Sequence, residues 1–212
     1  MRTLALALTA LLATPVVASA DTILTFGQSA SNSAVTGTAN AGGTATTITA
    51  NNAAISITQI DGGVPSSAFL DLNIASTDAA TPLGSGGSQH YSGSFSITSG
   101  AGDTGTNFLS GNFADIVLGV GPSAVLASGS PPDIINLTSD VIPVLAPPNA
   151  IALSFANLVP AFNIDNETIG SFTSSVSGTF SANAVPVPEP ASLVLLGLGM
   201  LGIAAVSRRH PG

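Results

Sequence analysis

The sequence contains no cysteine and no tryptophan, and only three of its 212 residues are basic. Without cysteine, the chain can form neither disulfides nor thiolate metal sites, and it has no cysteine nucleophile. The basic residues are Arg2, Arg208 and Arg209, so the long segment between them has no lysine or arginine. This composition argues against nucleic-acid binding and gives the body of the protein no electrostatic attraction to anionic lipids.

The first 20 residues have the three parts of a secretory signal peptide. Arg2 supplies the positive charge, Leu4–Leu12 is the apolar segment, and the small residues Ala18, Ser19 and Ala20 form a cleavage site. The apolar segment is too short for a membrane anchor. We therefore expect residues 1–20 to be removed, so that the mature chain begins at Asp21.

Residues 21–184 are predicted to form one all-β domain. Apolar and small hydroxyl residues alternate, as in Ile55-Ser56-Ile57 and Phe95-Ser96-Ile97, a pattern that disordered chains lack. This period of two predicts half-buried antiparallel strands, and the turn residues between them favour a β-sandwich or jelly roll. The residues expected in the core are Ile55, Ile57, Phe95, Ile97, Leu153, Phe155, Phe172 and Phe180.

Two regions of this domain are predicted to be irregular. Residues 130–149 contain five prolines and predict a long connection without regular structure. The stretch GGSQHYSG, residues 86–93, has the composition of a loop. No helix is expected before Pro186.

Candidates for catalysis are few. His90 is the only histidine of the domain, and beside a glycine-rich stretch it is more typical of a solvated residue than of a general base. Carboxylates could act in pairs in glycoside hydrolysis, but no spacing singles out two of them. Those available are Asp71, Asp78, Asp115, Asp165 and Glu167. We therefore expect no catalytic residue and no cofactor.

The stretch GDTGTN is the one candidate for a metal site. It places Asp103, Gly105 and Asn107 at alternate positions, as at the start of a calcium loop. No acidic residue follows where such a loop would close. A plain turn is the favoured interpretation, and no metal site is expected.

The chain ends with three segments of different character. Residues 185–190, VPVPEP, predict an extended linker because proline disfavours helix at the preceding residue. Residues 191–207 predict a single transmembrane helix, whose apolar run rises about 24 Å against a hydrocarbon core of about 30 Å. Arg208 and Arg209, in the basic tail 208–212, would stop transfer and remain cytoplasmic. A buried core helix is the alternative, but the run has no polar face.

This order resembles the PEP-CTERM sorting signal of exported Gram-negative bacterial proteins. The resemblance rests on Pro188-Glu189-Pro190, the Leu/Gly-rich run and the two final arginines, and it covers only about the last 25 residues. It implies that an exosortase, a membrane-embedded transpeptidase-like enzyme, recognises Pro188, Glu189 and Pro190 and that the tail is lost. It also implies an association with exopolysaccharide and biofilm. One departure is the ending RRHPG, where the family often has a longer basic cluster.

The sequence thus predicts an exported, non-enzymatic surface or extracellular-matrix protein. It would be anchored through its C-terminal helix before processing and would then reside in the cell envelope or outside the cell. One alternative is a carbohydrate-binding module, although Tyr91 is the only tyrosine of a tryptophan-free chain. A hydrolase is the other, and it would need a cleft that joins His90 or Glu167 to a second acid.

Overall fold

The fold consists of antiparallel strands and the turns between them. The computed structural model describes residues 20–28, 34–42, 45–83, 86–120, 124–127, 133–165 and 167–183, which belong to one unit, Ser19–Asn183. The strands are β1 (Ala20–Gln28), β2 (Val35–Ala39), β3 (Thr46–Ile60), β4 (Ser66–Ser76), β5 (Thr81–Leu83), β6 (Gly86–Gly100), β7 (Thr104–Val120), β8 (Ala124–Ala127), β9 (Ile134–Thr138), β10 (Ala146–Val159), β11 (Ile164–Asp165), β12 (Thr168–Ile169) and β13 (Phe172–Asn183).

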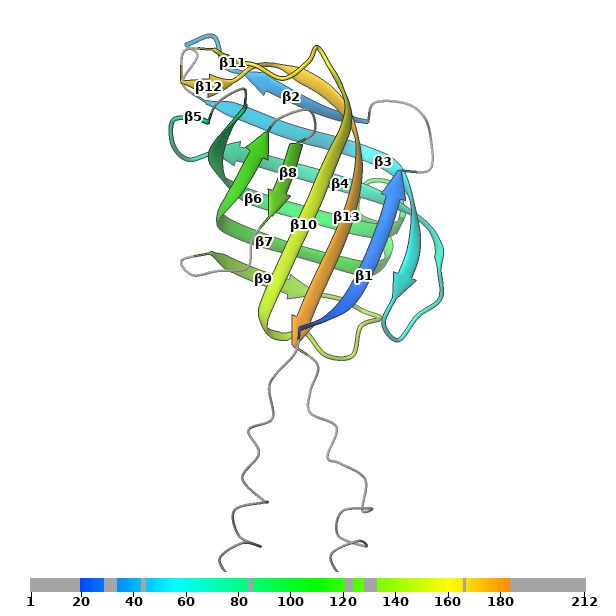
Figure 1. Cartoon of the computed structure of the whole chain (residues 1–212). Coiled ribbons are helices and arrows are strands. Elements are labelled where there is room, and N and C mark those ends of the chain that lie inside the picture. The colour runs from blue at the N-terminus through cyan, green and yellow to red at the C-terminus, as the bar shows by residue number, and fades with distance from the viewer. Residues whose placement is uncertain are drawn as a thin grey trace, which may run out of the picture. The chain divides into compact units, whose positions relative to one another are not determined.

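Eight of these strands close into a barrel (Figure 1). Their hydrogen-bonded order is β6-β4-β3-β1-β13-β10-β8-β7, and β7 pairs with β6 to complete the ring. The prediction of an antiparallel all-β domain is confirmed. The two separate sheets of the predicted sandwich are not found, because a single sheet curls round until its first and last strands meet. Closure pairs β6 with β7, which an open sheet would leave as its two edge strands.

Two positions in the barrel wall are each shared by two strands. Between β13 and β3, strand β1 pairs with the C-terminal half of β13, while the short strand β2 pairs with Phe172–Ser174 of β13. Along β7, strand β8 pairs with Val117–Val120 and β9 with Ser110–Ala114. Strand β5 pairs with Gly86–Ser88 of β6, on the edge that β4 occupies further along β6, and β11 and β12 form a separate two-stranded sheet.

The barrel interior is filled by the residues that the alternation predicts. All eight expected core residues are buried, so this prediction is confirmed. Phe180 stacks on Phe95, with ring centroids 4.7 Å apart, and on Phe26, at 6.2 Å. Glycine makes room for these rings, since a Cβ on Gly178 would collide with the ring of Phe26.

Two predicted irregular regions are corrected. Residues 134–138 within the proline-rich stretch form β9, where Ile135 and Leu137 pack partly buried against the core. The last residues of the stretch, 146–149, are the beginning of β10. The expected loop 86–93 is the beginning of β6, a strand of 15 residues. Glycine there serves close packing rather than a turn, because a Cβ on Gly87 would collide with Ile164.

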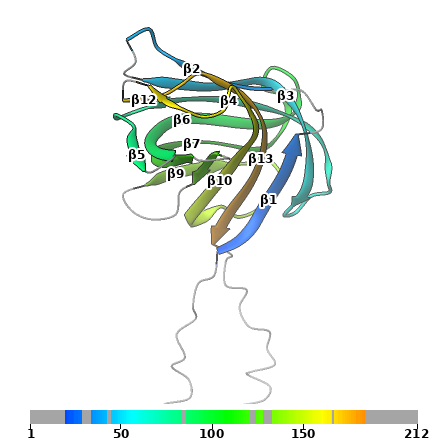
Figure 2. The same ribbon diagram turned by 45° about the horizontal axis from the view of Figure 1, so that its top comes forward.

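The first and last strands meet at one end of the barrel, which we call the exit end. Ala20 pairs with Asn183 and Asp21 with Ala182, so β1 begins where β13 finishes (Figures 1 and 2). The turn 61–65 and the connection 139–145 lie at the same end, since the Asp61 amide donates to the Ile23 carbonyl and Ala146, which follows the connection, pairs with Asn183.

Candidate functional site

The exit end is where the two predicted sorting segments join the barrel. The predicted signal-peptidase bond, Ala20–Asp21, lies at the start of β1, and exposed Asp21 is paired with Ala182. At the other terminus, only residues 184–187 separate Asn183 from Pro188. The remaining residues predicted to act in sorting lie outside the described part of the chain: Ala18, Pro188, Glu189, Pro190, Arg208 and Arg209.

The predicted membrane helix, residues 191–207, also lies outside the described residues. Within those residues no helix is long and apolar enough to cross a membrane.

His90 pairs with a carboxylate that sequence spacing did not connect to it. Its Nδ1 lies 2.5 Å from Oδ2 of Asp78, and its backbone amide donates to the other carboxylate oxygen at 2.9 Å. The hydrogen bond to Asp78 raises the pKa of His90 above 6.5, although partial burial opposes the shift. The carboxylates of Asp115 and Asp133 raise this pKa further.

This pair has the features of a structural ion pair on the surface rather than of a catalytic dyad. The side chains of His90 and Asp78 are 41% and 43% exposed, and neither residue lines the two hollows described below. The Asp78 backbone carbonyl also accepts a hydrogen bond from Nε2 of the buried Gln89 side chain at 2.8 Å. The contacts therefore fasten the segment after β4 onto β6.

A polar groove lies over β3, β4 and β6 and brings together two carboxylates. It has a volume of about 370 Å³ and is lined by Asp71, Asp103 and neighbouring asparagine and serine side chains. Asp71 is the cross-strand partner of Ser96, whose hydroxyl donates to Asp103. Asp71 also accepts a hydrogen bond from the Asn52 amide at 2.9 Å. These groups can hydrogen-bond a hydroxyl-rich ligand, and the groove contains no histidine.

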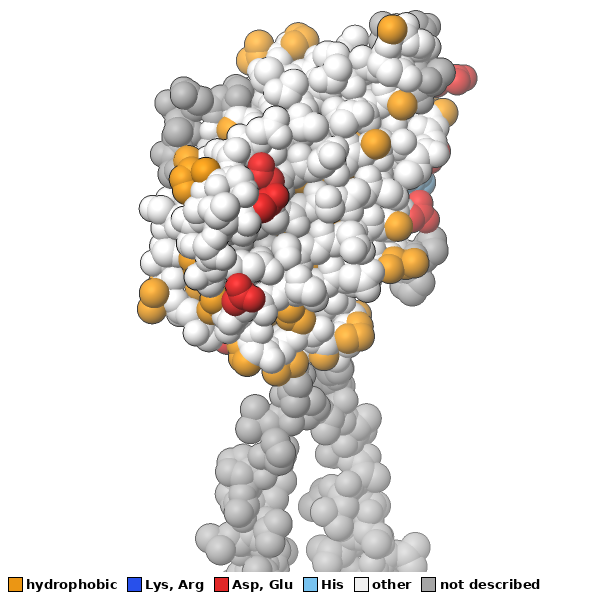
Figure 3. All heavy atoms as spheres, turned by 180° about the vertical axis from the view of Figure 1, so that it is seen from behind, with side chains coloured by type: hydrophobic (Ala, Val, Ile, Leu, Met, Phe, Trp, Pro, Cys, Tyr) orange, Lys and Arg blue, Asp and Glu red, His pale blue; other side chains and the backbone are white. Residues whose placement is uncertain are grey.

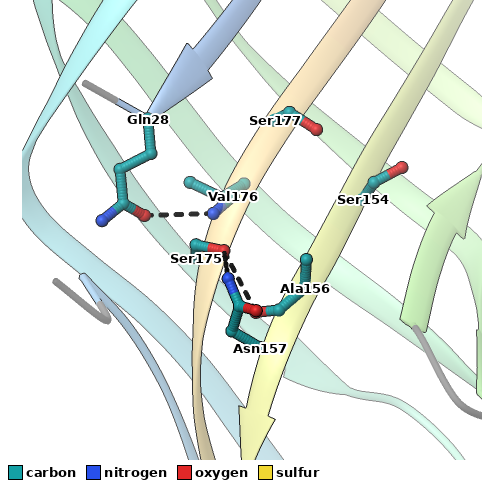
Figure 4. Close-up of a pocket in the computed structure, with 7 residues that line it drawn as sticks. All are labelled: Gln28, Ser154, Ala156, Asn157, Ser175, Val176 and Ser177. Carbon is teal, nitrogen blue, oxygen red and sulfur yellow. Dashed lines mark hydrogen bonds between the residues drawn. The ribbon is translucent and has the colours of Figure 1, made fainter. Parts of the chain in front are cut away.

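A second hollow, of about 320 Å³, is lined by β1, β10 and β13 (Figure 4). Gln28 points across the end of β1, and its side-chain oxygen accepts a hydrogen bond from the Val176 amide at 3.1 Å. Asn157 donates to the Ser175 hydroxyl at 3.1 Å. Its lining has no titratable side chain, so it offers hydrogen bonds but no acid–base chemistry.

The aromatic side chains offer no exposed platform for stacking on sugar rings. Tyr91 is fully buried, its hydroxyl donates to Oε1 of Gln89 at 3.0 Å, and burial raises the pKa of its phenol. The nine phenylalanines all fall within the described residues, and each is buried or half-buried.

The glycine-rich turn between β6 and β7 does not gather metal ligands. Asp103 points to Ser96, whereas the Asn107 side-chain amide donates to Ser110 at 2.9 Å. Across the part of the chain that the structure describes, no three His, Cys, Asp or Glu residues lie close enough to hold a metal ion. The interpretation of GDTGTN as a turn agrees with residues 101–103.

Sequence reasoning missed the Asp71–Asp103 groove and the His90–Asp78 pair for the same reason. Both are contacts between strands or between a strand and a turn, and strand register fixes them. The only local signal was a polar residue in an outward-facing position of an alternating strand, and many residues here share that property.

Comparisons with known proteins single out the C-terminal segment. Residues 186–209 match the family model described as the PEP-CTERM protein-sorting motif, which confirms the resemblance. No curated protein and no solved structure matches the chain. The match includes Pro188, Glu189 and Pro190 and begins three residues beyond the last residue of β13. The chain thus carries a sorting signal of exported proteins that are processed by an exosortase.

Proposed function

We propose that this protein is a non-enzymatic component of the cell surface or extracellular matrix. A signal peptide, residues 1–20, directs its export, and a helix over residues 191–207 holds it in the membrane until an exosortase removes the tail. The observation that carries the proposal is the sorting-motif match at residues 186–209. On this account, the folded barrel is the cargo and the tail is the enzyme's substrate.

The described residues support the non-enzymatic part of the proposal. The one histidine of the barrel is tied to Asp78 on the surface, and neither hollow contains a histidine. The two carboxylates of the groove are already engaged in the barrel wall, since Asp71 accepts a hydrogen bond from Asn52 and Asp103 accepts one from Ser96.

Exopolysaccharide is the partner that the outer wall of the barrel suits best. Serine and threonine side chains face outward along β13 and its neighbours, and the Asp71–Asp103 groove adds carboxylate and amide groups. The barrel has no lysine or arginine, so an acidic polysaccharide would be repelled and a neutral one is favoured. Hydrogen bonds alone would make this binding weak, because each contributes only about 0.5–1.5 kcal/mol.

The sorting function is tested by changing Glu189 to Ala in a host that has its own exosortase. We expect full-length Glu189→Ala protein to accumulate in the membrane fraction, because insertion depends on the apolar run whereas recognition depends on the motif. The matched control is Glu167→Ala, which removes the other glutamate at an exposed position of the barrel. The proposal fails if both variants are trimmed and distributed like the wild type.

A further inference from the structure

We propose that the exit end of the barrel is a membrane-contacting surface that rests on the bilayer interface before processing. This inference relies on the proposed anchoring by residues 191–207. It adds that the barrel has a fixed orientation and does not tumble freely above the membrane.

The first observation is an apolar rim at the exit end. Val64 is 75% exposed, more than any other bulky apolar side chain in the part of the chain that the structure describes. The exposed prolines of the rim are Pro65, Pro143, Pro147 and Pro148. Figure 3 shows hydrophobic side chains gathered along the lower border of the molecule. Exposed apolar groups that cluster at one place mark a contact surface more often than scattered ones do.

Contacts between the turns hold these residues at one place. A Cβ on Gly62 would lie 3.1 Å from Pro143, so the turn 61–65 packs directly on the connection 139–145. The Asn183 side-chain amide donates to the Pro147 carbonyl at 3.4 Å, which ties the end of β13 to the start of β10, directly after that connection. The rim therefore surrounds the point from which the C-terminal segment leaves.

The second observation is the length of the tether. Seven residues, 184–190, separate Asn183 from the start of the apolar run at Ala191, and they can span at most about 25 Å. The exit end is consequently confined to the neighbourhood of the bilayer surface. Such a short tether gives the rim a high effective concentration at the membrane, so a weak apolar contact suffices.

The charges at the exit end determine which lipid headgroups the rim can approach. Asp21, Asp61 and Asp140 are exposed there, and the barrel has no lysine or arginine. Anionic headgroups would be repelled, so the contact must come from Val64 and the prolines entering the interfacial region. We therefore expect a zwitterionic surface to be preferred over an anionic one.

The opposite end of β10 supplies a matched control. Val159 is 63% exposed, close to the exposure of Val64, but it lies at the other end of a strand of 14 residues. Such a strand rises by about 45 Å. Because the chain contains no cysteine, Val64→Cys and Val159→Cys each create a unique labelling site.

The experiment uses the mature chain, residues 21–212, in phosphatidylcholine vesicles, with a fluorophore at position 64 or 159 and a quencher attached to the lipid headgroups. Flotation with the vesicles is measured first. Quenching at position 64 should exceed that at position 159 at least threefold, and replacing a third of the lipid with phosphatidylglycerol should reduce it.

The outcomes separate the two proposals. A chain that does not float overturns the proposed anchor and, with it, the orientation. A chain that floats but is quenched equally at both positions keeps the anchor and overturns the orientation. A third outcome is that the fluorescence at position 64 changes with protein concentration but is not reduced by the lipid quencher. The rim would then contact a second copy of the chain, which also overturns the proposal.

Discussion

The barrel, residues 20–183, and the C-terminal segment, residues 186–209, carry different kinds of information. The barrel repeats a few residue types, apolar inside and hydroxyl-bearing outside, and many substitutions would preserve that alternation. The C-terminal segment is short, yet its order of motif, apolar run and arginines matches a family model. The fold is thus determined by many residues that can be replaced by similar ones, whereas sorting depends on a few particular residues.

Removing the apolar run should have the largest effect, because the barrel has no other evident anchor. In a host without an exosortase, we expect deletion of residues 191–212 to move the protein completely from the membrane to the soluble fraction. Deletion of residues 210–212 alone keeps the run and both arginines and should leave it in the membrane. Membrane retention of the larger deletion would show that the barrel itself binds the bilayer.

A core substitution should damage the barrel and leave the sorting signal intact. Phe180 is fully buried and stacks on Phe26 and Phe95, so Phe180→Ala should lower the free energy of unfolding by about 3–5 kcal/mol. Exposed Val159→Ala should change it by less than about 0.5 kcal/mol. Denaturant unfolding of residues 21–184, followed by circular dichroism, measures both values. Equal values would reject the assigned core.

A smaller effect is expected at the buried polar pair of Tyr91 and Gln89. Tyr91→Phe leaves the buried Gln89 oxygen without the hydrogen bond that the tyrosine hydroxyl donates, which should cost about 1–3 kcal/mol. Thr58→Val removes a hydroxyl that bonds Thr25 on the exposed surface and should cost much less. If the two variants unfold at the same denaturant concentration, the buried Tyr91–Gln89 hydrogen bond contributes no more to the free energy of unfolding than the exposed Thr58–Thr25 hydrogen bond.

The smallest effect concerns His90. Its folded pKa is raised, so its contribution to stability is complete below the unfolded pKa and is lost as the pH rises from about 6.5 through the folded value. Asp78→Asn should lower the folded pKa towards the value in the urea-unfolded chain, which NMR titration measures. An unchanged pKa in Asp78→Asn would mean that the pair does not form in solution.

The strands and the core could be predicted because alternation is a local property. Ile55, Ile57, Phe155 and Phe180 were all placed correctly by their spacing alone. The closure of the barrel could not be predicted in this way. A sandwich and a barrel share the same period of two, and they differ in long-range pairings such as that of β6 with β7.

Glycine and proline were the least reliable local signals. The stretch 86–93 was expected to be a loop, but Gly87 lies in β6 where the neighbouring Ile164 leaves no room for a Cβ. The proline-rich stretch contains β9, because its prolines flank the alternating residues 134–138 instead of interrupting them. Both residue types mark turns as well as close approaches, and only the neighbours in space distinguish the two.

The central claim is that the chain is exported and then trimmed at its sorting signal. The most direct test is the intact mass of the protein recovered from the cell that produces it. The account predicts a chain that begins at Asp21 and lacks residues 191–212, with any added group attached near Pro188–Pro190. A mass that extends from Asp21 to Gly212 would contradict exosortase processing, and a mass that includes Met1 would contradict export through a cleaved signal peptide.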